Sequence, residues 1–181
     1  MSDWLTELLV GPVEEAAPRL LGMRLVSELE GRTCAVVLSE VEAYGGSDDP
    51  ASHAYRGQTN RNMSMFESAG LAYVYRSYGI HWCLNVVTGP AGTGQAILLR
   101  AGVPSEGLAH MVERRGRSER VADGPGKLCQ ALGVTGAVDG VDLRVGSLRV
   151  DPGTPPKSYE STGRVGISRA VDRKWRFVAT D

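Results

Sequence analysis

Residues 33–44 read Thr-Cys-Ala-Val-Val-Leu-Ser-Glu-Val-Glu-Ala-Tyr, and two glycines follow them. A run of β-branched and apolar residues that ends at a glycine pair is typical of a β-strand. Because successive side chains of a strand point to opposite faces, every second residue of this run shares a face. One face then carries Val36, Leu38, Glu40, Glu42 and Tyr44. We therefore expect two carboxylates and a tyrosine to project together from the end of this strand.

Two interpretations of the acidic pair Glu40 and Glu42 stay open on the residues alone. A carboxylate is costly to bury without a partner, so the pair belongs either to a solvent-exposed strand face or to a functional site. Acids two residues apart on a strand are separated by roughly 6.7 Å, a distance within the range of inverting glycosidases. Both acids stand on one strand, however, and do not flank a substrate bond, so the spacing alone does not identify a hydrolase.

The rest of the sequence predicts short elements separated by turns. Further strands are expected at 23–29, 72–75, 82–87, 95–101, 142–150 and 164–178. Helices are expected at 4–9, behind an N-cap at Asp3, and at 13–21, 107–121 and 127–132. Since strands outnumber helices and hairpin-like loops join them, we expect an α+β fold. It would be a single mixed domain over residues 1–181, with a curved, largely antiparallel β-sheet core flanked by short helices.

Length and composition restrict the class of protein. The chain has 181 residues, 42% of them hydrophobic and 23% charged, which is ordinary for a soluble globular domain and excludes a fibre, tail or solenoid. No run approaches the roughly 20 apolar residues of a membrane-spanning helix. The N-terminus lacks the basic and apolar regions of a secretory signal. We therefore expect a cytoplasmic protein with no membrane partner.

The cysteines and histidines are few and scattered. The three cysteines are Cys34, Cys83 and Cys129, and the three histidines are His53, His81 and His110. Because no Cys-x-x-Cys pair occurs, we expect the cysteines to be reduced core residues. No spacing among these residues resembles a zinc site, so we expect no metal and no other cofactor.

The charge is distributed unevenly, although its sum is only −1. Residues 1–50 carry ten acids and three bases, whereas residues 51–181 carry eleven acids and seventeen bases. The bases gather at Arg114, Arg115, Arg117 and Arg120 in the predicted helix, and at Arg164, Arg169, Arg173, Lys174 and Arg176 near the C-terminus. These clusters fit either a surface that follows a phosphate backbone or a solvated helix face paired with Glu113 and Glu119.

The run from Leu71 to Asn85 is rich in tyrosine. Tyr73 and Tyr75 share one face of a predicted strand, and Tyr78 precedes a glycine at an expected turn. An aromatic residue at a turn beside a basic surface suits a wedge into a stack of bases, and aromatic faces in a pocket suit an extracted base. The alternative is that these tyrosines simply pack in the core, since tyrosine is a good strand residue.

Ordered motifs extend over nearly the whole chain. They are Glu40-Val-Glu-Ala-Tyr44, Asp49-x-x-x-His53, Gln58-Thr-Asn-Arg-Asn62, Met65-Phe66, Tyr73-Val-Tyr-x-x-Tyr-Gly79, Cys83-Leu-Asn85, Leu98-Leu-Arg-Ala101, Gly124-Pro-Gly-Lys-Leu-Cys-Gln-Ala-Leu132 and Arg164-Val-Gly166. In their joint order and spacing they resemble the alkyladenine (3-methyladenine) DNA glycosylase family, the single-domain type of mammals and many bacteria. Each motif taken alone is common.

The resemblance implies a reaction and a site. The reaction is hydrolysis of the N-glycosidic bond between deoxyribose and a damaged purine in double-stranded DNA, of the 3-methyladenine, 7-methylguanine, hypoxanthine and ethenoadenine class. Glu42 is then the general base that activates water, and Arg100 helps to fix that water and a nearby phosphate. The base pocket would consist of Tyr44, His53, Tyr75, Asn85 and Val165. Tyr78 would fill the space that the base leaves in the duplex. The DNA backbone would contact Arg56, Arg61, Lys127 and Arg164.

The same resemblance implies a monofunctional enzyme, because water is the nucleophile and no catalytic lysine is needed. Glu40 is expected to be a carboxylate that supports the site or the fold. We expect a monomer that acts in the bacterial cytosol, at the nucleoid, and initiates base excision repair. A protein that binds and flips damaged bases without excising them is the competing hypothesis.

Overall fold

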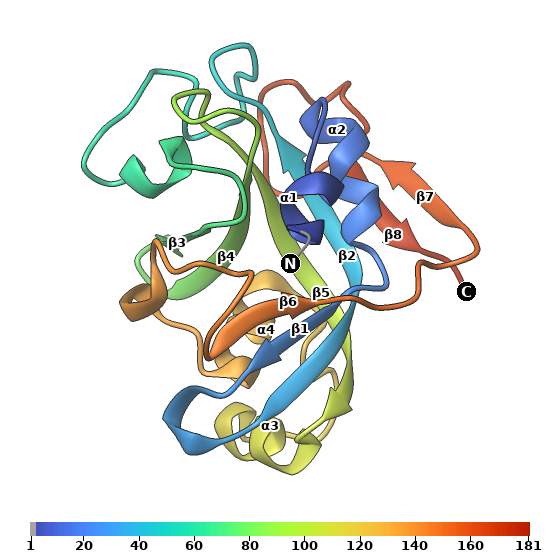
Figure 1. The fold of residues 1–181 in the computed structure, drawn as a ribbon. Helices are drawn as coiled ribbons and strands as arrows, with labels where there is room; N and C mark the ends of the chain where they lie inside the picture. Colours follow the sequence, from blue (N-terminus) through green and yellow to red (C-terminus); the bar gives the residue numbers. More distant parts are fainter. Residues whose placement is uncertain (1–2) are drawn as a thin grey trace.

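Strands β2 (Cys34–Tyr44) and β5 (Gln95–Glu106) form the longest pairing of the sheet. The computed structural model describes residues 3–181 (Figure 1). The strand order is β3-β4-β5-β2-β1-β6, and the β7–β8 hairpin attaches along β2. The other strands are β1 (Arg24–Ser27), β3 (Ala72–Ser77), β4 (His81–Thr88), β6 (Leu148–Asp151), β7 (Tyr159–Thr162) and β8 (Arg176–Ala179).

All of these pairings are antiparallel, and the sheet is strongly curved (Figure 1). The helices are short and lie beside the sheet. They are α1 (Trp4–Leu8), α2 (Val13–Ala16), α3 (Leu108–Arg115), α4 (Pro125–Leu132) and the 3₁₀ turns η1 (Ala17–Leu20), η2 (Leu29–Gly31), η3 (Met63–Phe66) and η4 (Gly136–Val138). The expected α+β fold with a curved antiparallel sheet is confirmed.

The faces of β2 differ from the strict alternation that the sequence predicts. The main apolar core contains Cys34, Val36, Leu38, Val41 and Ala43, so the core side shifts by one residue in mid-strand. The register explains the shift, because Ser39 is an extra residue of β2 and Arg100 is an extra residue of β5. Such β-bulges redirect the side chains that follow them. The prediction that Val36 and Leu38 share a face with the acids is therefore wrong, and Glu40, Glu42 and Tyr44 face away from the core.

The helix expected at 107–121, which carries a basic cluster, is shorter than predicted. α3 ends at Arg115, because Gly116 adopts a left-handed conformation (φ 66°) and its N–H bonds to the carbonyl of Val112. Arg117 and Arg120 therefore lie beyond the helix and do not extend its basic face.

The C-terminal strands also differ from the prediction. Residues 163–175 form a loop, and the expected 164–178 run becomes a strand only from Arg176, where β8 begins. Its hairpin partner β7 lies before that run, and β5 continues five residues past the predicted end at Ala101. β8 pairs with β2 at Glu40–Glu42, so the loop before it reaches the end of β2 that carries the acids.

Buried residues from all four α-helices pack with the sheet in the main apolar core. A second cluster lies on the other side of β3 and contains Tyr73 and Met65, with Tyr44 and Tyr75 packed against it. The acids of β2 and the tyrosines of β3 therefore approach the same region. In the described part of the chain, every helix is too short or too polar to cross a membrane.

Candidate active site

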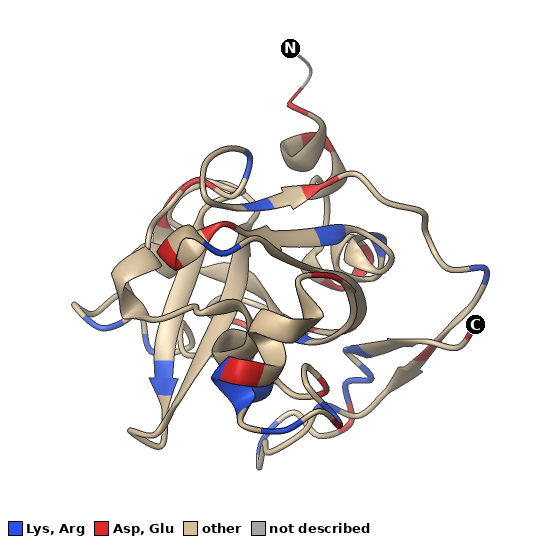
Figure 2. Ribbon diagram, turned by 90° about the horizontal axis from the view of Figure 1, so that it is seen from below, with Lys and Arg blue, Asp and Glu red and all other residues tan. Residues whose placement is uncertain are grey.

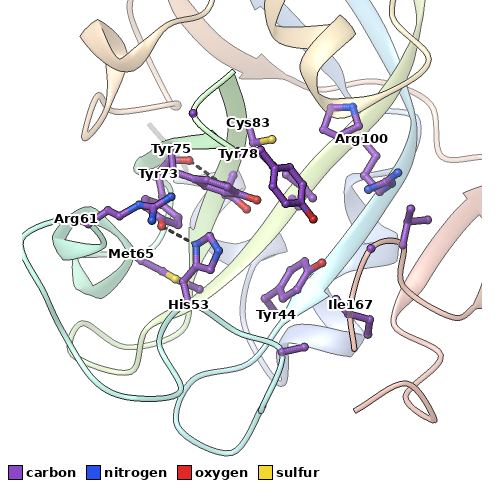
Figure 3. Close-up of a pocket in the computed structure, with 18 residues that line it drawn as sticks. Tyr44, His53, Arg61, Met65, Tyr73, Tyr75, Tyr78, Cys83, Arg100 and Ile167 are labelled. Carbon is purple, nitrogen blue, oxygen red and sulfur yellow. Dashed lines mark hydrogen bonds between the residues drawn. The ribbon is translucent and has the colours of Figure 1, made fainter. Parts of the chain in front are cut away.

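A cavity of about 550 Å³ opens where the ends of β2, β3, β4 and β5 meet two loops. His53, Tyr73 and Tyr75 gather on one side of it, and Arg100 lies across from them (Figure 3). Eight of the residues predicted for the site line this cavity: Tyr44, His53, Arg61, Tyr75, Tyr78, Asn85, Arg100 and Val165. The structure thus brings together residues that are separated by more than a hundred positions in the chain.

Aromatic rings form one wall of the cavity. His53 lies edge-on to Tyr75 with ring centres 4.5 Å apart, and Tyr73 stacks on Tyr75 at 5.4 Å. Nδ1 of His53 and the hydroxyl of Tyr73 share a hydrogen bond of 2.9 Å, which fixes the imidazole ring. The sequence analysis assigned no role to Tyr73, although it placed Tyr73 and Tyr75 on one face of their strand.

The ionisable groups of this wall are neutral at neutral pH. Loss of water around the ring, together with the charge of Arg61, lowers the pKa of His53 below its ordinary value. Burial raises the pKa of the hydroxyls of Tyr44, Tyr73 and Tyr75. The wall therefore offers uncharged aromatic faces and an uncharged imidazole to a bound ring.

Glu42 is completely buried behind this cavity and is held at both carboxylate oxygens. Oε2 accepts a 2.8 Å hydrogen bond from the Tyr44 hydroxyl, and Oε1 accepts a 2.7 Å bond from the Val165 N–H. Nη1 of Arg100 lies 3.5 Å from Oε1. All three of these partners line the cavity, so Glu42 contacts its wall from behind. The open question of the acidic pair is thus answered for Glu42, which is not on a solvent-exposed face.

Glu40 shares Arg100 with Glu42 and also bonds Arg176. Its Oε1 accepts hydrogen bonds from Nε of Arg100 at 2.7 Å and from Nε of Arg176 at 2.6 Å. The carboxylate therefore supports Arg100.

The β3–β4 hairpin ends in an exposed aromatic tip. Tyr78 and Gly79 both have positive φ, at 50° and 67°, and the N–H of Ile80 bonds to the carbonyl of Ser77 at 3.0 Å. This is the geometry of a type I′ turn, in which a tyrosine at the first central position is strained. The side chain of Tyr78 is 88% exposed and that of Ile80 is 66% exposed, although sequence analysis did not single out Ile80.

Asn85 is buried in the middle of β4 and lines the cavity. Its Nδ2 donates a 3.0 Å hydrogen bond to the carbonyl of Tyr73 in the neighbouring strand. The amide is therefore fixed in position at the cavity wall.

The predicted contact between Arg164 and the DNA backbone is wrong, because this side chain is fully buried. Its guanidinium donates to both carboxylate oxygens of Asp49, at 2.6 and 2.9 Å, and to the carbonyl of Ala43. It also lies over the rings of Tyr44 and Trp175. Arg164 thus ties the 164–167 loop to the end of β2.

The other predicted backbone contacts remain predictions. Arg56 and Arg61 are exposed, and Nη2 of Arg61 donates to the carbonyl of Arg76. Nζ of Lys127 pairs with Asp123 at 2.7 Å. Each of these residues is near enough to the surface to meet a phosphate.

The uneven charge along the sequence is largely paired within the fold. Basic and acidic segments are interspersed over the ribbon (Figure 2). Arginines from 51–181 pair with acids from 1–50, namely Asp3, Glu28, Glu30, Glu40, Glu42 and Asp49. Arg114, for example, bonds Glu30 and two backbone carbonyls, so it belongs to the fold and not to a basic face. Across residues 3–181, no group of three or more His, Cys, Asp or Glu side chains is placed to hold a metal ion.

An aromatic cavity of this size, with a buried carboxylate behind it and an exposed tyrosine beside it, suits a base that has been taken out of a duplex. The class of protein that combines these features is a DNA glycosylase, a hydrolase of the N-glycosidic bond. Residues 7–181 match the family model described as Methylpurine-DNA glycosylase (MPG), and the chain belongs to this family.

Curated relatives agree with this assignment. Proteins from Rubrobacter xylanophilus, Rhodopseudomonas palustris and Methanoculleus marisnigri each carry the name "Putative 3-methyladenine DNA glycosylase". They are 47%, 46% and 49% identical to this chain over 88%, 93% and 89% of its length, and the matches cover 84%, 81% and 86% of their own lengths. The family resemblance that the ordered motifs indicate is confirmed.

Proposed function

We propose that the whole chain acts as one monofunctional glycosylase domain that removes damaged purines from duplex DNA and so initiates base excision repair. The observation that carries this proposal is Glu42, a buried carboxylate held at both oxygens by residues of the cavity wall. Burying a carboxylate is costly, and a protein that only binds a base gains nothing from one at this place.

In the first step the damaged nucleotide leaves the base stack and enters the cavity. Extruding a base costs a few kcal/mol and is easiest for a damaged or mispaired base. Tyr78 fills the space that the base vacates, since it is exposed at the tip of a hairpin beside the cavity. The strained backbone at Tyr78 holds the ring outward in the free protein.

In the second step the pocket selects the base. The rings of Tyr44 and Tyr75 attract alkylated purines, which carry a positive charge, through cation–π interactions. Neutral lesions such as hypoxanthine and ethenoadenine are recognised instead by a hydrogen bond between His53 and the edge of the base. Asn85, fixed by its bond to β3, excludes undamaged guanine because it clashes with the 2-amino group of that base.

In the chemical step a water molecule attacks C1′ of the deoxyribose. Glu42 accepts a proton from this water, the new C1′–O bond forms, and the bond to the purine breaks with its electron pair leaving on the base. The negative charge of Glu42 also favours the oxocarbenium-like transition state. Arg100 orients the water and the adjacent phosphate, and the backbone of Val165 completes the water site. Because water and not a lysine attacks, the product is an abasic site in an intact strand.

The partner is double-stranded DNA that contains a damaged purine, bound by the protein as a monomer. Arg56, Arg61 and Lys127 would contact phosphates, so binding should weaken steeply as salt rises. Since the substrate is chromosomal DNA, we place this activity in the bacterial cytosol, at the nucleoid.

Single-turnover excision from duplex oligonucleotides tests this proposal. Duplexes with ethenoadenine, hypoxanthine or 7-methylguanine are incubated with excess protein, and abasic sites are detected by cleavage with alkali. We expect alkali-dependent cleavage at a lesion, no cleavage without alkali, and none in an undamaged duplex. Tight binding to every lesion without release of any base would contradict the proposal and favour a lesion-binding protein.

A further inference from the structure

Glu40 is an ionised carboxylate next to the site that has no part in the reaction as described above. Although burial opposes it, hydrogen bonds from Arg176 and Arg100 hold the pKa of Glu40 below its ordinary value. Only 17% of the side chain is exposed, and one oxygen, Oε1, accepts both hydrogen bonds. The cations come from two different strands, β5 and β8, which flank β2 on opposite sides.

Fold stability alone gives little reason for this arrangement. β8 is already held to β2 by backbone pairing at Glu40–Glu42 and by Phe177, which is buried in the main core. The attraction within a partly buried ion pair is largely offset by the loss of hydration, so such a pair is weak evidence of a stabilising role.

The orientation of Arg100 gives a stronger reason. Arg100 is the bulged residue of β5, and its side chain enters the gap between Glu40 and the cavity. Its Nε is bonded to Glu40, while Nη1 lies 3.5 Å from Glu42. A guanidinium group is planar and rigid, so fixing Nε also fixes the directions of the remaining N–H groups. Glu40 thereby determines how Arg100 meets Glu42 and the cavity.

Charge balance gives a second reason. The titratable groups that face the Glu42 carboxylate come from five strands. They are Tyr44 of β2, Tyr75 of β3, Cys83 of β4, Arg100 of β5 and Arg176 of β8. Burial raises the pKa of both tyrosines and of the cysteine, so these three are neutral. The two arginines then carry two positive charges against Glu40 and Glu42. Glu40 is the group that prevents an excess of positive charge around Glu42.

We propose that Glu40 is a positioning residue of the glycosylase: it holds Arg100 toward Glu42 and the substrate. This inference rests on the proposed function, in which Glu42 takes a proton from water. Without the Glu40 carboxylate, Arg100 loses the acceptor that fixes its Nε, and its remaining N–H groups are no longer directed at Glu42 and the cavity.

The test is single-turnover excision of ethenoadenine by Glu40→Leu, which removes the acceptor for Arg100, and by Glu40→Gln, which keeps one. We expect the rate of Glu40→Leu to fall about tenfold and Glu40→Gln to recover most of it, with binding of the duplex close to that of wild type in both. Arg176→Gln leaves the hydrogen bond between Arg100 and Glu40 in place and should keep most of the wild-type rate. Glu106→Gln is the matched control, because Glu106 also lies on β5 and pairs with an arginine but is half exposed and far from the cavity. It should behave as wild type.

A loss of rate in Glu40→Leu that Glu40→Gln rescues supports the inference, since a loss of packing alone would not be rescued by a hydrogen-bond acceptor. A wild-type rate in Glu40→Leu, or an equal loss of rate in Glu40→Leu and Glu40→Gln, overturns it. If Glu40→Leu fails to fold, as judged by thermal unfolding, Glu40→Ala takes its place. Failure of the proposed function is a separate result, because it would appear as full excision by Glu42→Gln.

Discussion

The ion pair between Asp49 and Arg164 should be one of the most sensitive sites for stability in this protein. Neither side chain is exposed, and hydrogen bonds of 2.6 and 2.9 Å join them. Asp49→Asn removes the negative charge but leaves the guanidinium buried between the rings of Tyr44 and Trp175. Removing one partner of a buried pair typically costs about 3–5 kcal/mol, because the remaining charge has lost its counter-ion.

This loss should be large in a thermal unfolding experiment. For a domain of this size, 1 kcal/mol corresponds to a change in Tm of roughly 2–4 °C, so Asp49→Asn should lower Tm by about 6–20 °C. The loss should also depend on pH. Burial raises the pKa of Asp49, but hydrogen bonds from Arg164 and from the N–H of Gly45 outweigh it, and the net pKa is lowered. The stabilisation is therefore present above the unfolded pKa of about 3.9 and is lost as pH falls through the folded value.

Urea unfolding of wild type and Asp49→Asn at neutral and acidic pH measures both effects. Asp123→Asn is the control, because Asp123 forms exposed ion pairs with Arg120 and Lys127 and should change stability little. A loss below about 1 kcal/mol at neutral pH, or a difference that grows in acid, would refute the assignment of Arg164 as a buried structural cation.

Two further predictions concern the hairpin tip and the pocket. Tyr78→Asn places Asn-Gly in the type I′ turn, so it should raise stability by about 0.5–1 kcal/mol while it reduces excision more than nonspecific DNA binding. Equal losses in excision and binding, or a loss of stability, would contradict a wedge held in a strained turn. Asn85→Ser should admit guanine and its analogues, measured as release of undamaged guanine, and an unchanged base profile would remove Asn85 from discrimination.

The sequence predicts those strands well that are marked by a continuous apolar run and a nearby glycine turn. The apolar runs and glycine turns locate β2, β3, β4 and β5 within a few residues. The two bulges could not be foreseen, because a bulge is defined by the partner strand and Ser39 and Arg100 lie far apart in the chain. The end of α3 was predictable from Gly116, because a left-handed glycine commonly follows the last residue of a helix, but the predicted helix continued to residue 121.

The site was predicted through ordered motifs, because its members come from four strands and from loops that no local pattern connects. Sequence cannot distinguish an arginine that meets DNA from one that is buried, and Arg164 was misassigned for this reason. Its burial depends on Asp49 and on two aromatic rings from other segments. Tyr73 was left out of the predicted site although it begins one of the motifs, and Ile80 directly follows the same motif.

The central claim is that Glu42 activates water in a site that the rest of the chain assembles. Glu42→Gln keeps the size of the side chain and one acceptor oxygen, which can accept from the Val165 N–H while the amide NH2 donates to the Tyr44 hydroxyl, but it removes the base. The decisive measurement is single-turnover excision of ethenoadenine by this variant, with binding to the same duplex measured beside it. The account predicts binding close to that of wild type and a rate lower by about a hundredfold to ten-thousandfold, the usual contribution of a general base. Excision at the wild-type rate would contradict it.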